Sequence, residues 1–155
     1  MLNAVSVDVE EWHDTVLFSG QPGLRDLRTS LPENTLEILD LLDRSAVKAT
    51  FFILGSVAEK YPGTVKAIAR AGHEIASHGM THAGANKMTM EEFEKTAADS
   101  RKLLTGIAGR EPAGYRAPTF SIHSRDLCYM EALKRAGYSY DSSLYPSPVF
   151  SGRST

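Results

Sequence analysis

The sequence of 155 residues contains a single cysteine, Cys128, and no excess of positive charge. One cysteine cannot form a disulfide within the chain, and no neighbouring base would activate Cys128 as a nucleophile. We therefore expect Cys128 to be a small buried residue on a helix.

Long apolar runs are also missing. No stretch approaches the ~18 consecutive apolar residues of a membrane-spanning helix. The first residues lack the basic and apolar regions of a secretion signal, which predicts a cytoplasmic protein. Acidic and basic residues are mixed along the chain, with a net charge of −2. This mixture argues against nucleic acid or an anionic membrane as the main partner and favours a small or neutral substrate.

The residues that are present predict an ordinary globular α/β fold. The chain is 42% hydrophobic and 23% charged, and its length suits one domain, residues 1–155, with a hydrophobic core. Apolar runs predict strands at 2–9, 48–54, 73–77, 114–121 and 138–141. Helical spacing predicts helices at 33–44, 57–60, 63–71, 88–107 and 124–136, with N-caps at Ser56 and Thr89. Such alternation predicts a parallel sheet with outer helices, and the Gly- and Pro-rich segment up to Pro32 predicts a long loop.

Polar side chains lie at the ends of several predicted strands. They are Asp8, Glu10, His78, His82, Arg116 and Asp141. Because functional groups of α/β folds gather at the carboxyl ends of the strands, we expect these side chains to face one mouth. The spacing of His78 and His82 lets both imidazoles point at one metal ion, although two surface histidines of a polar loop are the simpler alternative.

Two carboxylates are placed to complete such a site. Asp8 and Glu10 are two residues apart, so they project on the same side of an ideal strand. One would bind a divalent cation with the two histidines, and the other would take a proton from water as that water attacks a carbonyl. An arginine beside the free carboxylate would keep it ionised and oriented, and Arg116 is the candidate. This set of residues predicts metal-assisted hydrolysis.

Five segments of the sequence occur in the order found in polysaccharide deacetylases. They are Ser6–Glu10 (SVDVE), Thr50–Gly55 (TFFILG), Gly72–His82 (GHEIASHGMTH), Tyr115–Phe120 (YRAPTF) and Gly137–Ser143 (GYSYDSS). The chain resembles a NodB-homology domain of carbohydrate esterase family 4. Its Asp-Val-Glu-Glu opening and Tyr-Asp-Ser-Ser ending look most like the deacetylases associated with bacterial exopolysaccharide biosynthesis.

The resemblance implies roles for particular residues. Asp8 matches the family's catalytic base, His78 and His82 its metal-binding histidines, usually of zinc, and Arg116 the arginine that orients the base. The backbone N–H of Thr119 falls where the family stabilises an oxyanion. The family has a second aspartate where this chain has Val9. The third metal ligand must therefore be Glu10, which we favour, or Glu11.

Other polar and aromatic residues have two interpretations each. Trp12 and Phe120 are candidates to stack on a sugar, although a single aromatic more often packs in the protein. Asp141 is either a turn residue or a support for Arg116, and we count it among the candidate substrate-binding residues. His73 is predicted to be structural. His13 and His123 are predicted to be solvated, with a role near the metal or substrate as the alternative for His13.

The resemblance also implies more chain than is present. The family fold is a distorted barrel of about seven βα units, of which 155 residues supply roughly five. We therefore expect a partial barrel whose C-terminal units are missing, including the family's histidine that protonates the leaving amine. We expect its open edge to be covered by a missing C-terminal segment, by self-association, by another chain or by the tail after Ser142.

Three functions remain open on the sequence alone. The leading hypothesis is a metal-dependent hydrolase, most simply with zinc, that removes acetyl groups from N-acetylated sugars of a polysaccharide or oligosaccharide. One alternative is a metal-independent hydrolase of small cyclic amides, like allantoinase-type relatives. The other is a non-catalytic carbohydrate-binding remnant.

Overall fold

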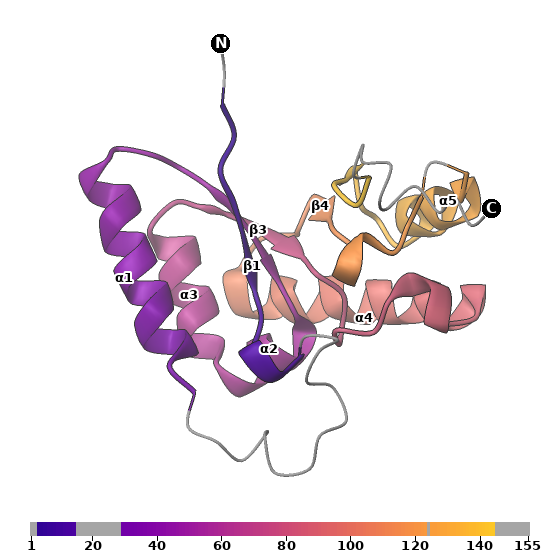
Figure 1. Ribbon diagram of the computed structural model, residues 1–155, viewed down its shortest axis with the longest axis horizontal. Coiled ribbons are helices and arrows are strands. Elements are labelled where there is room, and N and C mark those ends of the chain that lie inside the picture. Colours follow the sequence, from indigo (N-terminus) through magenta and orange to yellow (C-terminus); the bar gives the residue numbers. More distant parts are fainter. Residues whose placement is uncertain (1–2, 15–28, 124, 145–155) are drawn as a thin grey trace, which may run out of the picture.

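The centre of the molecule is a parallel β-sheet (Figure 1). The computed structural model describes residues 3–14, 29–123 and 125–144. The strands of this part are β1 (Ser6–Val9), β2 (Thr50–Ile53), β3 (Glu74–Ser77), β4 (Gly114–Tyr115) and β5 (Tyr140–Asp141). Their order in the sheet is β1-β2-β3-β4-β5, and every neighbouring pair is parallel. Spatial order therefore equals chain order, as in part of a (β/α) barrel.

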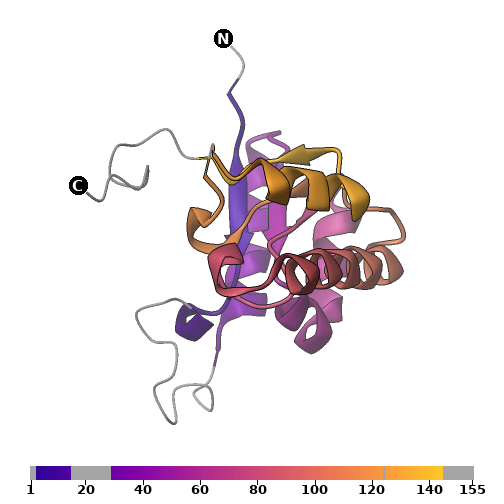
Figure 2. The same ribbon diagram turned by 90° about the vertical axis from the view of Figure 1, so that its right-hand side faces the viewer.

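Helices connect and cover the strands. They are α1 (Leu31–Arg44), α2 (Gly55–Lys60), α3 (Pro62–Arg70), α4 (Met90–Ala108) and α5 (Leu127–Arg135). Short 3-10 helices lie at Trp12–Asp14, Ala85–Lys87 and Pro118–Phe120. Figure 1 shows α1 and α3 side by side, and Figure 2 shows α5 packed along α4. The predicted α/β fold with parallel strands and outer helices is confirmed.

Two hydrophobic clusters form the core of the described residues, and β2 is among its most buried strands. Phe51, Phe52 and Ile53 are each at most 2% exposed, as expected for a strand inside a parallel sheet. The first cluster fills the space between β1, β2, β3 and the helices α1 and α3. The second lies between β4, α4 and α5 and contains Phe93 and Leu133. The sheet is thus fixed by packing on both sides of β3.

The apolar face of α1 is narrower than its sequence pattern suggests. Leu39 and Leu42 are buried and Ile38 packs against them, as helical spacing predicts. Leu36 and Leu41 have the same spacing but are 56% and 57% exposed. A strip of about 100° is enough to bury a surface helix, so the remaining leucines lie outside it.

One predicted helix cap is confirmed and one is wrong. The Thr89 side chain accepts a hydrogen bond from the Glu92 amide, and the Glu92 carboxylate accepts one from the Thr89 amide, which forms a capping box at α4. Ser56 does not cap α2, because the helix already begins at Gly55. Its first amides instead donate to carbonyl groups of another loop.

Some predicted boundaries also differ. β1 begins at Ser6 rather than near the first residue, and the strand predicted over 114–121 ends at Tyr115. Pro118 then starts a 3-10 helix in which Thr119 and Phe120 have φ of 56° and 51°, a conformation that cannot continue a strand. Most of the predicted long loop lies at 15–28, outside the described residues, as do the start of the predicted helix at Ser124 and the tail after residue 144.

Two predictions of burial are wrong. Cys128 is exposed, on the outer side of α5, and His13 is buried with 7% exposure instead of solvated. His73 is structural as predicted, because its buried ring accepts a hydrogen bond from the Ala49 amide. Among residues 3–14, 29–123 and 125–144, every helix is too short or too polar to span a bilayer.

Candidate metal centre

Several of the predicted site residues meet at the carboxyl ends of the strands. Glu10 follows β1, His78 follows β3, and His82 lies four residues further on. One ligand atom from each of these three residues lies within 4.8 Å of the others. Arg116 follows β4, and its Nη1 atom donates to Asp8 Oδ1 at 2.6 Å. The structure therefore brings five of the six side chains expected at one mouth close together there, and Asp141 is the exception.

The three atoms are the right kinds for a divalent cation of the zinc type. Glu10 Oε2 lies 2.8 Å from His82 Nε2 and 3.6 Å from His78 Nε2. His78 is 2% exposed, whereas Glu10 and His82 are half-buried, so the group opens to solvent on one side. Two imidazole nitrogens and one carboxylate oxygen leave a fourth position for water or substrate.

An unsatisfied buried atom supports the fit. Glu10 Oε2 is buried, and among the described residues it has no hydrogen bond of good geometry, despite its close ion-pair contacts with the imidazoles. Burial raises the pKa of the Glu10 carboxyl, but His78 and His82 outweigh this effect and lower that pKa to about 2. Glu10 in turn raises the pKa of His82. The carboxylate is therefore held as an anion that points at two nitrogen donors, as a cation ligand must be.

The hydrogen bond on the far side of the His78 ring fixes the orientation of that ring. His78 Nδ1 lies 2.8 Å from the Arg116 carbonyl oxygen. A carbonyl can only accept, so Nδ1 donates this hydrogen bond and Nε2 is the ring atom that faces Glu10. Metal-binding histidines are held in this way in known sites. The same residue thus orients the histidine through its main chain and Asp8 through its side chain.

The Arg116 guanidinium is held from several directions. Besides Asp8, it donates to Ser6 Oγ at 3.1 Å and to Ser142 Oγ at 2.9 Å. Its Cζ atom lies 4.0 Å from the centre of the Phe52 ring, a cation–π contact. These contacts leave the guanidinium little freedom, so the position of the Asp8 carboxylate is well defined.

The structure separates the two glutamates that the sequence left as candidates, and it agrees with the favoured one, Glu10. Glu11 does not join the histidine pair. Its carboxylate is 3% exposed and accepts hydrogen bonds from Thr29, Lys60 and Tyr61. Of the two candidate third ligands, only Glu10 is brought to the histidines.

The turn between the two histidines depends on buried hydroxyls that sequence reasoning missed. The Gly79 amide donates to Ser77 Oγ at 3.0 Å, and Ser77 Oγ lies 2.7 Å from Ser100 Oγ on α4. The Gly79 carbonyl accepts from the Gly55 amide at 2.8 Å and from Ser100 Oγ at 3.3 Å. Ser100 is fully buried in an otherwise amphipathic helix, and a serine at a buried helical position was the only signal in the sequence.

We expect Gly79→Ala to destabilise the fold by about 1–2 kcal/mol, because φ at Gly79 is +88°, in the left-handed region that disfavours a Cβ atom. Gly106→Ala is the matched control. Gly106 lies inside α4 with nothing within 4 Å of an added Cβ, so alanine should be neutral or stabilise by up to about 1 kcal/mol. Urea unfolding measures both changes, and equal stabilities of the two variants would contradict the expectation.

The predicted substrate-binding residues are placed differently from one another. Phe120 lies beside the site, with its ring centre 5.7 Å from Arg116 Cζ, and Thr119 is exposed next to it. Two consecutive non-glycine residues at positive φ are unusual, and such strain often marks a functional loop. Trp12 is 41% exposed and meets the His13 ring edge-on, with ring centres 5.5 Å apart.

Asp141 adopts the turn arrangement that was one of its two interpretations. Its oxygens accept from the Ser143 amide at 2.9 Å and from the Ser143 hydroxyl at 2.5 Å. Ser143 Oγ also accepts from the Ala117 amide at 2.7 Å, next to Arg116. Burial raises the pKa of the Asp141 carboxyl. Asp141 therefore supports the arginine loop through Ser143, without a hydrogen bond to the guanidinium among the described residues.

Comparison with known proteins gives consistent matches. The family model for polysaccharide deacetylases matches residues 23–140. A peptidoglycan-N-acetylglucosamine deacetylase of Bacillus cereus is 41% identical over 95 residues, which cover 61% of this chain and 34% of that protein. A peptidoglycan deacetylase of Helicobacter pylori is 30% identical over 128 residues, which cover 83% of this chain and 39% of that protein. The chain thus spans little more than a third of the length of these relatives.

A solved structure gives the same result for the fold. A crystal structure from Mycobacterium smegmatis, of a protein provisionally named a polysaccharide deacetylase, superimposes with a TM-score of 0.77 at 30% identity. The match covers 91% of this chain and 50% of the other. The predicted fold class, a partial (β/α) barrel of this type, is confirmed.

Proposed function

Because the chain belongs to the polysaccharide deacetylase family, we propose that it carries the active site of a metal-dependent hydrolase acting on acetamido groups of N-acetylated sugars. The observation that carries this proposal is the group of Glu10, His78 and His82, with ligand atoms within 4.8 Å of one another. Asp8 lies near the same end of β1 as Glu10, is paired with Arg116 from the end of β4, and supplies a base. The names of the relatives favour a glycan that contains N-acetylglucosamine as the substrate.

Each residue has one task in the proposed mechanism. Glu10, His78 and His82 would hold a divalent cation such as zinc, which would act as a Lewis acid toward the acetyl carbonyl and make water more acidic. Asp8 takes a proton from the attacking water, whose oxygen bonds to the carbonyl carbon. The C–N bond then breaks, and a proton is returned to the amine nitrogen as acetate leaves. Arg116 keeps the Asp8 carboxylate at the angle at which it can accept the proton.

The loop at Thr119 is proposed to stabilise the developing negative charge. Its backbone N–H follows Pro118 in the strained turn beside Arg116, and preformed donors at such a position contribute strongly to acyl-transfer catalysis. Phe120 and the exposed Trp12 offer aromatic faces on which sugar rings can stack. This loop would therefore hold the acetyl group and its sugar against Asp8.

Metal removal tests the proposal. The purified chain, loaded with one equivalent of zinc, should release acetate from N-acetylglucosamine oligomers. Dialysis against a chelator should abolish that release, and zinc should restore it. The measurement is enzymatic quantification of acetate together with elemental analysis of the protein.

Two results would overturn the proposal. Activity that survives complete removal of metal would favour a metal-independent amide hydrolase. Binding of the glycan by zinc-loaded protein without acetate release would favour a non-catalytic carbohydrate-binding protein.

A further inference from the structure

Glu11 is a buried carboxylate that the proposed mechanism does not use. It is 3% exposed and directly follows Glu10. Its Oε1 atom accepts from Tyr61 Oη at 3.0 Å and from Lys60 Nζ at 3.3 Å, and its Oε2 atom accepts from Thr29 Oγ1. Every polar contact of this carboxylate is therefore with a donor, and both of its oxygens are engaged.

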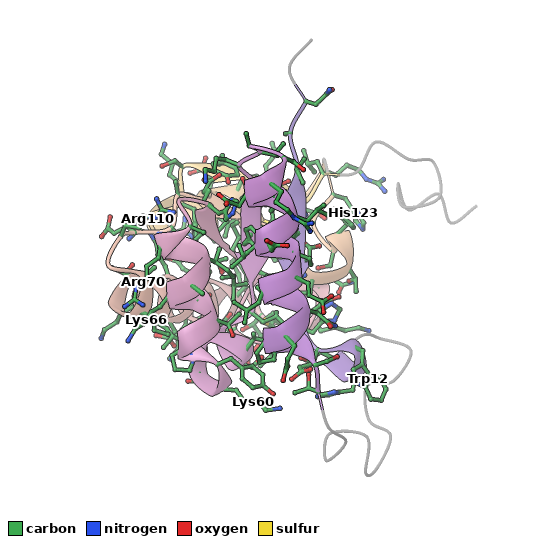
Figure 3. All side chains as sticks on the ribbon, turned by 90° about the vertical axis from the view of Figure 1, so that its left-hand side faces the viewer. Trp12, Lys60, Lys66, Arg70, Arg110 and His123 are labelled. Atoms are coloured by element: carbon green, nitrogen blue, oxygen red, sulfur yellow. The ribbon has the colours of Figure 1, made fainter. Side chains whose placement is uncertain are left out.

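The three donors come from elements on which the end of β1 rests. Thr29 precedes α1, and its hydroxyl also accepts from the Leu31 amide at 3.1 Å, so it is tied to the start of that helix. Lys60 and Tyr61 form the junction between α2 and α3. Figure 3 shows Trp12 and Lys60 at the same end of the molecule, where β1 ends. Through these hydrogen bonds, Glu11 connects the end of β1 to the start of α1 and to the junction of α2 and α3.

The partners of Glu10 and Glu11 are entirely different. Glu10 meets the histidine pair, whereas Glu11 meets the helices. Glu10 and Glu11 are joined by a peptide bond. Fixing the side chain of one therefore limits where the side chain of the other can point. The Glu11 carbonyl also accepts from the Asp14 amide at 2.9 Å, which closes the 3-10 helix that follows. The backbone on the C-terminal side of Glu10 is therefore held by its own neighbour.

We propose that Glu11 is a positioning residue for the metal centre, which holds the β1 end so that the Glu10 carboxylate meets His78 and His82. This inference rests on the proposed function. Stability alone is a weak reason to bury the Glu11 carboxylate, because apolar side chains of similar volume often serve as well as a buried charged group or better. A metal site, in contrast, requires each ligand to be held within about 0.5 Å of its working position.

Zinc affinity tests the inference. Glu11→Gln keeps the shape of the side chain but loses its charge and one acceptor. We expect zinc to bind about 10- to 100-fold more weakly, the range found when residues that orient metal ligands are replaced. Competition with a chromophoric chelator measures the affinity. Thr29→Val and Tyr61→Phe each remove one donor and should weaken zinc binding less than Glu11→Gln does.

A spectroscopic signal separates positioning from loss of folding. With saturating cobalt in place of zinc, the visible absorption of Glu11→Gln should differ from that of the unaltered protein, because the carboxylate ligand is displaced. Glu94→Gln is the matched control. Glu94 pairs with Arg135 between α4 and α5, away from β1, so its replacement should change neither zinc affinity nor the cobalt spectrum.

The outcomes distinguish this inference from the proposed function. If the unaltered protein binds zinc and Glu11→Gln binds it equally tightly with an unchanged cobalt spectrum, the positioning role is wrong and the proposed function stands. If the unaltered protein binds no zinc, the proposed function fails and the inference fails with it. Should Glu11→Gln not fold, unchanged affinity in both Thr29→Val and Tyr61→Phe overturns the inference.

Discussion

Asp8→Asn should lower the rate of acetate release by about 100- to 10,000-fold while zinc remains bound, the range for loss of a general base. Asparagine has nearly the same shape as aspartate and can still accept a hydrogen bond from Arg116, so the arginine loses its ion pair but keeps a partner. It cannot take a proton from water. The measurements are initial rates at saturating substrate and the zinc content of the same preparation.

The control for this substitution is Asp99→Asn. Asp99 lies on the exposed face of α4 and pairs only with Lys95, four residues earlier, among the described residues. Its replacement should leave the rate unchanged. If Asp8→Asn kept more than a tenth of the activity, Asp8 would not be the base. If it lost the zinc instead, Asp8 would be a ligand and the assignments of the two carboxylates would be reversed.

Replacing either histidine of the centre by alanine should weaken zinc binding by more than the roughly 100-fold that loss of an orienting residue costs. Either change reduces the donor set from three side chains to two. His82→Ala should affect mainly the metal. His78→Ala should in addition lower the free energy of unfolding, because it empties a site that is 2% exposed and leaves the Arg116 carbonyl without its hydrogen bond.

His123→Ala is the control for the histidine variants. His123 is half-buried on the loop after the 3-10 helix at Pro118–Phe120, and it is not one of the three residues whose ligand atoms cluster. Zinc affinity should be the same as in the unaltered protein. A His82→Ala protein that bound zinc with unaltered affinity would remove His82 from the centre.

The meeting of the main site residues could be predicted from the sequence, because their positions follow from two local rules. Parallel strands bring the ends of β1, β3 and β4 to one edge of the sheet, and the motif spacing places two histidines in one turn. Strand periodicity also favours Glu10, which projects on the same side as Asp8, but the position of Glu11 could not be predicted in this way. It depends on Thr29, Lys60 and Tyr61, which are 18 to 50 positions away along the chain from Glu11.

The features that sequence reasoning missed also depend on distant contacts. Ser100 supports the histidine turn across 23 positions of chain from Ser77, and nothing in its own helix indicates that contact.

The end of β4 could be predicted only in part. Pro118 indicates a break in the strand, but the positive φ of Thr119 and Phe120 is a backbone strain that only the folded loop imposes.

Arg116 contacts both His78 and Asp8, so the orientations of these two side chains depend on one point of the backbone. Its carbonyl sets the orientation of an imidazole, and its guanidinium sets the direction of a carboxylate. A shift of this single residue would therefore move the His78 imidazole and the Asp8 carboxylate together, and the separation between them would be largely preserved. A side-chain replacement at the same position keeps the carbonyl, so the hydrogen bond to His78 can remain when the contact with Asp8 is lost.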